Sequence, residues 1–512
     1  MLRIRLKFRY EALWLIAAVV VSTLEIYAAT ARDRGWTVGA GDAAGNRPLT
    51  VVHEVRPIGV TSASGNGTIL VVGNPAADSD GDVEVVLRAT RIPQNGGTSG
   101  VQGAGSTSPF LTPQRHPIPE SSARSLDSSA VSTEIARQMD FRSTDLKRVY
   151  FLPAQMSAAS GNDRHTPVPC GLTCETPRVR IFLDQRLPPG PPLSRLVNAV
   201  AAAAESELGE VVEALAGRVR DVDHDGHLAI VITPEVARVG GGRTPVDGLT
   251  RPTDFHPGLD RPHGNCSDVI FLSSTLVPGN QLRAVLAHEW CHAASFSRRS
   301  EPLLKGTQTA QDDWLNEATA HLVEVRASGT DRNVAHRIRN FLANPGQSPL
   351  VVRNYCRPEF WRHDGCRGAG YLFLESCLAV TDENFLTDLL DHDDPGMAGL
   401  EATFGQSFEN LFFRWTMRLG QHLASDGATA IPGVACQDLD SPPRLAHRTW
   451  RLSGDGRQTM TVRLRSSCAE FVRVETDDNA TWQLSLLASG ADSASLQTSL
   501  IPVAGKSSQT CR

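Results

Sequence analysis

The stretch Leu282–Phe296, LRAVLAHEWCHAASF, constrains the chain most, because it combines a helix-forming pattern with an H-E-x-x-H motif. Neither Gly nor Pro interrupts it, and Asn280 just before it can cap a helix N-terminus. On a helix, His288 and His292 project from one face, about one turn apart. Two such imidazoles can share one Zn²⁺, with Glu289 beside them to handle the proton of an activated water.

A second stretch, WLNEATAHLVE from Trp314 to Glu324, strengthens this interpretation. It is a good helix former, with acidic residues before it and Gly329 after it. A catalytic zinc takes three protein ligands and keeps one open position, and a carboxylate from a second helix can complete that set. Glu317 is the candidate. Either stretch alone would fit a helix with ordinary surface or core histidines, but the two in this order predict a zinc site.

HEWCH followed by WLNEATAHLVE resembles the gluzincin metallopeptidases, in which the Glu of an N-E helix is the third metal ligand. Within that group the chain is most similar to the hyicolysin-type family, whose members have comparable pieces in the same order. In this chain those pieces are DVDHDGHLAIVIT, GNCSDVIFL, the two helices above and a GYLF-type helix, between about Arg178 and Gly420. The resemblance implies an α+β fold with a zincin-like metallopeptidase domain, built from a small mixed sheet and a helical lobe, that hydrolyses peptide bonds.

The chain departs from the thermolysin-like relatives at His321, where those relatives place an Asp that supports a zinc-binding His. We therefore expect that support to come from another group. The candidates are Asp312, Asp313, Glu324 or main-chain carbonyls.

The reaction implied is zinc-assisted hydrolysis of a protein or peptide substrate. His288, His292 and Glu317 would hold the metal, which activates a water. Glu289 would take the proton of that water as it attacks the scissile carbonyl, and would deliver it to the leaving amine.

A phenol near the metal could donate a hydrogen bond to the oxyanion. Tyr371, in the GYLF segment, is the first candidate for this catalytic role, ahead of Tyr355 and His363. The competing interpretation is an aromatic ring that only packs at the start of a helix.

Residues Met1–Ala31 have the pattern of an export signal. A basic start precedes the apolar run Leu13–Leu24, and Ala29-Thr30-Ala31 fits a cleavage site. Glu25 interrupts the run before it reaches the roughly 20 apolar residues of a membrane span. We therefore expect a secreted or periplasmic protein with no stable membrane insertion once the signal is cleaved. A retained signal anchor is the alternative.

The chain has ten cysteines, all beyond the signal, and an even number in an oxidising compartment favours disulfides. The locally plausible pairs are Cys170–Cys174, Cys356–Cys366 and Cys468–Cys511. Cys291 lies on another face of the zinc helix than the histidines, so we expect it in the core or in a disulfide.

The formal net charge of −6, without a basic tract, argues against nucleic-acid binding.

The chain divides into a signal, a β-rich N-terminal module or pro-segment, a Gly/Ser/Pro-rich linker, a metallopeptidase domain and a C-terminal β-sandwich-like module. The respective ranges are 1–31, 32–92, 93–144, 145–425 and 440–512. One alternative is a non-catalytic secreted binding or adhesion protein that retains the gluzincin fold. In another, the flanking β modules carry the main role, as an adhesin or carbohydrate-binding protein, and the peptidase only processes.

Three further stretches carry predictions. Asp221–Gly226 has the first half of a calcium-loop pattern, so Ca²⁺ could bind there, but a tight turn before the strand Leu228–Thr233 is the favoured interpretation. Asp268–Leu272 is either an edge strand that could pair with a substrate or a buried structural strand. Leu193–Arg218, with its run of alanines, predicts one long amphipathic helix.

Overall fold

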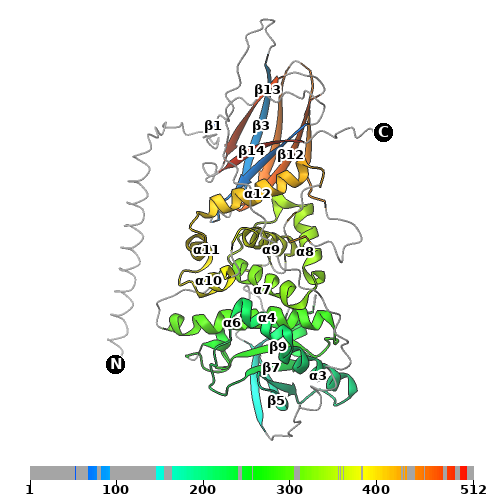
Figure 1. The fold of residues 1–512 in the computed structure, drawn as a ribbon, viewed down its shortest axis with the longest axis vertical. Helices are drawn as coiled ribbons and strands as arrows, with labels where there is room; N and C mark the ends of the chain where they lie inside the picture. Colours follow the sequence, from blue (N-terminus) through cyan, green and yellow to red (C-terminus); the bar gives the residue numbers. More distant parts are fainter. Residues whose placement is uncertain are drawn as a thin grey trace, which may run out of the picture. The chain divides into compact units, whose positions relative to one another are not determined.

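A computed structural model gives the chain a mixed α+β fold, with three sheets in the described residues (Figure 1). The structure describes residues 52–53, 67–77, 82–92, 146–154, 164–239, 245–304, 312–427, 431–434 and 444–503. Within these ranges there are gaps at 257, 356, 358, 361–362, 382–383, 432, 455, 477–480 and 490–495. The predicted signal and linker lie outside the described residues.

A six-stranded sheet has the order β4-β5-β6-β7-β9-β8. Its strands are β4 Lys147–Pro153, β5 His165–Glu175, β6 Val179–Asp184, β7 Leu228–Thr233, β8 Gly248–Leu249 and β9 Val269–Ser273. The three strands β6, β7 and β9 are parallel, and the other pairs are antiparallel. Every residue of β7 and β9 is buried, as their continuous apolar sequences require for strands covered on both faces. The buried interpretation of the 268–272 strand is therefore confirmed, and the sheet edge is β8.

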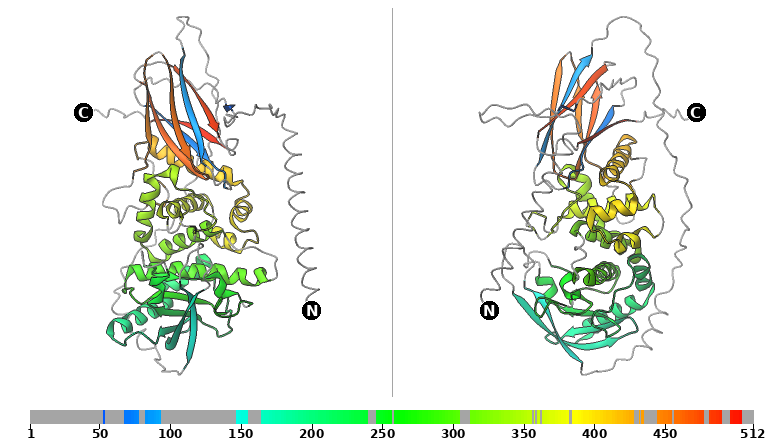
Figure 2. Two further views of the ribbon diagram at one scale, coloured as in Figure 1. Left: turned by 180° about the vertical axis from the view of Figure 1, so that it is seen from behind. Right: turned by 90° about the vertical axis from the view of Figure 1, so that its left-hand side faces the viewer.

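Helices cover one face of this sheet, as Figure 2 shows. The first two are α3 Pro191–Glu205 and α4 Glu207–Ala216, so the single long helix predicted for 193–218 is wrong. The break is at Ser206, whose backbone is extended and whose hydroxyl accepts a hydrogen bond from the Leu208 amide. Ser206 is thus the N-cap of a new helix.

The helical part of the chain follows β9. Its members are α6 Asn280–Leu304, α7 Asp313–Ser328, α8 Arg332–Ala343, α9 Asp364–Leu378, α10 Phe385–Asp391, α11 Gly396–Phe404 and α12 Phe408–Ala424. Short helices α5 Glu235–Arg238, η1 Pro252–Phe255 and η2 Pro345–Gln347 lie in the connections. Helix α7 packs against both α6 and α9, and α8 packs against α9. No helix in the described part of the chain is long and apolar enough to cross a membrane.

The remaining two sheets form one sandwich from both ends of the chain. Their orders are β1-β13-β3-β11 and β10-β12-β2-β14. The N-terminal strands are β1 Val52–His53, β2 Thr68–Asn74 and β3 Val83–Ile92, and the C-terminal strands are β10 Arg448–Leu452, β11 Arg457–Leu464, β12 Cys468–Thr476, β13 Thr481–Ser489 and β14 Gln497–Pro502. Strands β2 and β3 are central in their sheets, and one core joins both segments.

This arrangement corrects the division into two separate β modules. The described strands within 32–92, β1 to β3, complete the sheets of the C-terminal module, so this part of the chain does not form an independent module. Helix α12 also packs on this sandwich, beside β2 and β14. A Cβ on Gly420 would lie 2.6 Å from Ile501 and 2.7 Å from Val71, so the helix approaches the sheet closely at that glycine.

Candidate metal centre

The centre lies where α6 crosses α7. Helix α6 buries Leu282 and Leu286 under the sheet and turns the opposite side toward α7. Helix α7 is fixed at its start by Trp314, which is fully buried against Phe373 and Phe408, and it ends at Gly329 in the left-handed region. These contacts fix α7 against α9 and α12, and α6 packs directly along α7.

His288, His292 and Glu317 meet at this crossing. The Nε2 atoms of the two histidines are 3.1 Å apart. One carboxylate oxygen of Glu317 is 3.7 Å from His288 Nε2, and the other is 3.8 Å from His292 Nε2. A tetrahedral zinc with bonds of about 2.0–2.2 Å needs its donor atoms roughly 3.4 Å apart, so the spacing fits such an ion.

The chemistry of the donors fits a cation as well. His288 Nδ1 lies 3.1 Å from Glu324 Oε2, so a proton on Nδ1 would be accepted by Glu324 and would leave a lone pair on Nε2 whenever the ring is neutral. Burial lowers the pKa of His288, but Glu324 and Glu317 raise it above its ordinary value. Two imidazole nitrogens 3.1 Å apart then require a proton or a cation between them. Glu317 Oε2 is buried and makes no hydrogen bond within the described residues, although Arg367 forms an ion pair with it at 3.2 Å, so this oxygen can still coordinate an ion.

Glu324 is the carboxylate that contacts Nδ1 of His288, the ring nitrogen that is not the proposed metal ligand. The same Oε2 atom lies 3.0 Å from Nδ1 of His321, so one oxygen serves two imidazoles. Of the groups considered from the sequence, Glu324 therefore takes the position that supports a histidine. Asp313 instead accepts a hydrogen bond from the Tyr355 amide, and Asp312 stands at the start of α7.

Glu289 is held from the sheet side. Thr250, just after β8, donates to Glu289 Oε2 over 2.8 Å. Burial raises the pKa of Glu289 to about 7, against the lowering effects of His288 and of the Thr250 hydrogen bond. A carboxyl group with this pKa can both accept and release a proton near neutral pH.

The charges around the other ligands set their protonation. Burial and the neighbouring His288 lower the pKa of His292 to about 4, which keeps it neutral. Burial would raise the pKa of Glu317, but Arg367 and the histidines hold it well below its ordinary value. One guanidinium nitrogen of Arg367 is 3.2 Å from Glu317 Oε2, and its guanidinium lies 5.1 Å above the Tyr355 ring.

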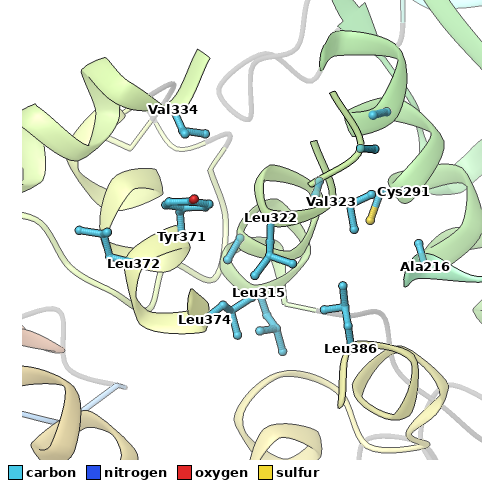
Figure 3. Packing of buried hydrophobic residues seen from close by; sticks show 14 of the residues in the cluster. Ala216, Cys291, Leu315, Leu322, Val323, Val334, Tyr371, Leu372, Leu374 and Leu386 are labelled. Carbon is cyan, nitrogen blue, oxygen red and sulfur yellow. The ribbon is translucent and has the colours of Figure 1, made fainter. Parts of the chain in front are cut away.

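Tyr371 and His363 have other partners. The Tyr371 hydroxyl donates toward Glu375 at 3.3 Å and toward the Gly433 carbonyl at 3.4 Å. Figure 3 shows its ring beside Leu372 in the hydrophobic packing of α9. His363 caps α9 by accepting a hydrogen bond from the Cys366 amide. The structure thus brings the three predicted ligands and Glu289 together, but gives the Tyr371 hydroxyl contacts away from them.

Thr250 and Arg367 were not predicted from the sequence. Thr250 is distant in sequence from the helix it contacts, and Arg367 lies in the Gly-rich start of α9. Neither has a motif of its own, because each acquires its role only when the sheet and helices pack. The only sequence signal for Arg367 is a charged residue within an otherwise buried helical turn.

The aspartate-rich stretch before β7 forms a tight turn. Asp221 accepts hydrogen bonds from the amides of Asp225 and Gly226. Asp223 and Asp225 pair with Arg148 at 2.8 and 2.9 Å, and Asp225 also pairs with Arg180 at 2.9 Å. Two guanidinium groups therefore already neutralise these carboxylates, which lie within 4.8 Å of one another.

The described cysteines are free thiols, which corrects one predicted pairing. Cys170 and Cys174 lie on β5 on either side of an irregularity in its pairing with β6, and they face different cores. Side chains four positions apart on a strand are also about 13 Å apart, too far for a disulfide. Cys291 is a buried free thiol in the core near Ala216 and Val323, which is the first of the two positions predicted for it (Figure 3). The other two predicted pairs each include a residue outside the described ones.

No protein-family model matches this chain, and no curated protein matches it significantly. The interpretation of the centre therefore depends on its own geometry and chemistry.

Proposed function

We propose that the chain is an exported zinc-dependent peptidase of the gluzincin type, with a zincin-like domain over residues 145–425. The observation that carries this proposal is the convergence of two imidazole nitrogens and one carboxylate from α6 and α7, with Glu289 next to the first ligand. Zinc is the metal that suits two neutral imidazoles and a carboxylate with one position left open.

When bound, zinc would act as a Lewis acid that makes a water acidic and polarises the scissile carbonyl. His288, His292 and Glu317 would hold it, and Glu324 would fix the ring of His288 with Nδ1 as donor. Glu289 would take the proton of the attacking water and pass it to the leaving amine. Its raised pKa, about 7, suits both transfers at neutral pH.

Negative charge that develops on the carbonyl oxygen needs a donor or a cation nearby. The largely buried guanidinium of Arg367, 3.2 Å from the proposed ligand Glu317, is our candidate for this purpose, because the Tyr371 hydroxyl lies within hydrogen-bonding distance of Glu375 and the Gly433 carbonyl instead. The proposed substrate is a protein or peptide outside the cytoplasm, in keeping with the export signal predicted for Met1–Ala31.

Glu289→Gln tests the proposal most directly. The variant keeps the ligands but loses the proton acceptor, so it should retain a full equivalent of zinc and hydrolyse casein about 10²–10⁴ times more slowly. Elemental analysis and a chelator-reversible casein assay measure the two properties. Glu207→Gln, an exposed glutamate at the start of α4, is the matched control and should behave as the wild type.

Two outcomes would contradict the proposal. If Glu289→Gln hydrolyses casein at the wild-type rate, Glu289 is not the proton acceptor. If the wild-type protein holds zinc but hydrolyses no protein substrate, the protein is a binding or adhesion protein with a metal centre.

A further inference from the structure

The segment 247–251 runs along the side of α6 that carries Glu289. Thr250 Oγ1 lies 2.8 Å from Glu289 Oε2 and 3.1 Å from the Glu289 main-chain oxygen. Both residues are buried, with exposed fractions of 8 % and 7 %. A hydroxyl in this position holds the Glu289 carboxylate in one orientation relative to α6.

Gly248 brings this segment close to the same side chain. A Cβ at Gly248 would lie 2.6 Å from Glu289 Cγ and 2.7 Å from Glu289 Oε1. The backbone of Gly248 is outside the left-handed region, so the glycine is required for space and not for its conformation. Glu289 therefore has Thr250 at one carboxylate oxygen and the backbone of β8 close to the other.

The segment itself is well anchored. Gly248 and Leu249 pair with β9, and the Ser273 amide donates to the Asp247 carbonyl over 2.8 Å. The next residue, Arg251, forms a buried ion pair with Asp254 and donates to the Phe151 carbonyl over 2.9 Å. Thr250 thus stands between two fixed points, and its hydroxyl has little freedom to follow a moving partner.

We propose that Thr250 is a positioning residue for the general base, holding the Glu289 carboxylate at the orientation in which it meets the attacking water. This inference rests on the function proposed above. Of the two carboxylates next to the ligand set, Glu289 and Glu324, Glu289 is the one held from the sheet edge, where an extended peptide would approach. A displacement of about 1 Å at a reacting group can reduce a rate on the order of 100-fold, so one hydrogen bond can be decisive.

The test compares Thr250→Val, which removes the hydroxyl at nearly constant shape, with Thr250→Ser, which keeps it. We expect Thr250→Val to lower kcat by about 10- to 100-fold, with KM and zinc content within about twofold of the wild type. Thr250→Ser should recover most of kcat. A kcat unchanged in Thr250→Val, or a Thr250→Ser variant as slow as Thr250→Val, would overturn the proposal.

Thr233→Val is the matched control. Thr233 is also a buried threonine at the end of a strand in the same sheet, and it donates to a carboxylate, Asp184 Oδ2, over 2.7 Å. Its loss should lower the unfolding temperature and leave kcat unchanged. If Thr233→Val slows the reaction as much as Thr250→Val, the effect is a general loss of packing, and the proposal is wrong.

A second measurement does not depend on activity. The unfolding midpoints of the wild type, Thr250→Val, Glu289→Gln and the double variant form a double-mutant cycle. Because the two side chains bind each other, the shifts should not add. Additive shifts would overturn the proposed contact between Thr250 and Glu289. If the shifts are non-additive but the protein hydrolyses no substrate, the contact stands and only the peptidase function is rejected.

Discussion

Two clusters of carboxylates in this protein differ in what faces them. At the crossing of α6 and α7, Glu317 and Glu324 face imidazoles, and Glu317 also pairs with the guanidinium of Arg367 at 3.2 Å. In the turn before β7, Asp223 and Asp225 face the guanidinium groups of Arg148 and Arg180. A neutral imidazole offers a lone pair to a metal, but a guanidinium offers only donors. The presence of imidazoles beside the carboxylates, more than the carboxylates themselves, distinguishes the candidate metal centre from the ion-paired turn.

The strongest test of this difference between the two clusters compares the Glu317→Gln variant with the Asp225→Asn variant. Glu317→Gln removes a charged ligand, so we expect loss of bound zinc and of all hydrolysis. Asp225→Asn leaves Arg148 and Arg180 without a common partner, so we expect a loss of about 1–3 kcal/mol of unfolding free energy with full zinc content. Elemental analysis and thermal unfolding measure both variants. Loss of zinc from the Asp225→Asn variant would contradict the proposed difference between the two clusters.

The ligands could be predicted because their spacing is local. His288 and His292 are one helical turn apart in any helix that contains them, and Glu317 lies in a second strongly helical stretch. The sequence could not select Glu324 from Asp312 and Asp313, because that choice depends on how α7 is rotated against α6. The rotation is set by packing, including that of the fully buried Trp314.

Glu324→Gln tests the support of the metal centre and should have the next largest effect. It removes the charge that one oxygen presents to both His288 and His321. Loss of such a partner weakens metal binding by about 10- to 100-fold, measured by competition with a chelator. Glu375→Gln, another buried glutamate on a packed helix, is the control and should bind zinc as the wild type does. Equal affinities for the two variants would contradict the role of Glu324.

The positions of the sandwich strands along the sequence could be predicted, but which strands pair with one another could not. Alternating or continuous apolar runs mark β2, β3 and β12 one by one, because burial on a strand is a local property. The pairing of β12 with β2 joins residues such as Val472 and Leu70 across the whole helical part of the chain. Nothing in a single strand specifies such a distant partner, so the two ends were assigned to separate modules.

Asp268→Asn should have the smallest functional effect, since it changes only how stability depends on pH. Burial and the charges of Asp223 and Asp221 raise the pKa of Asp268 to about 7. In the unfolded chain it titrates near about 4, so between these values the native state binds a proton that the unfolded state lacks. This residue therefore makes the wild type lose stability as pH rises from about 4 to 7, by up to about 1.4 kcal/mol per pH unit.

The asparagine cannot titrate, and its side-chain oxygen can still accept the hydrogen bond of the Val222 amide. Asp268→Asn should therefore be more stable than the wild type at pH 8, and the difference should close as pH falls toward 4. Denaturant unfolding at a series of pH values measures this, with the exposed Asp260→Asn as control. If the curves of unfolding free energy against pH are parallel for Asp268→Asn and the wild type, the arginines of the turn neutralise Asp268 too. The contrast would then be sharper still, because the carboxylates near the turn would face only guanidinium groups, whereas Glu317 faces two imidazoles as well as Arg367.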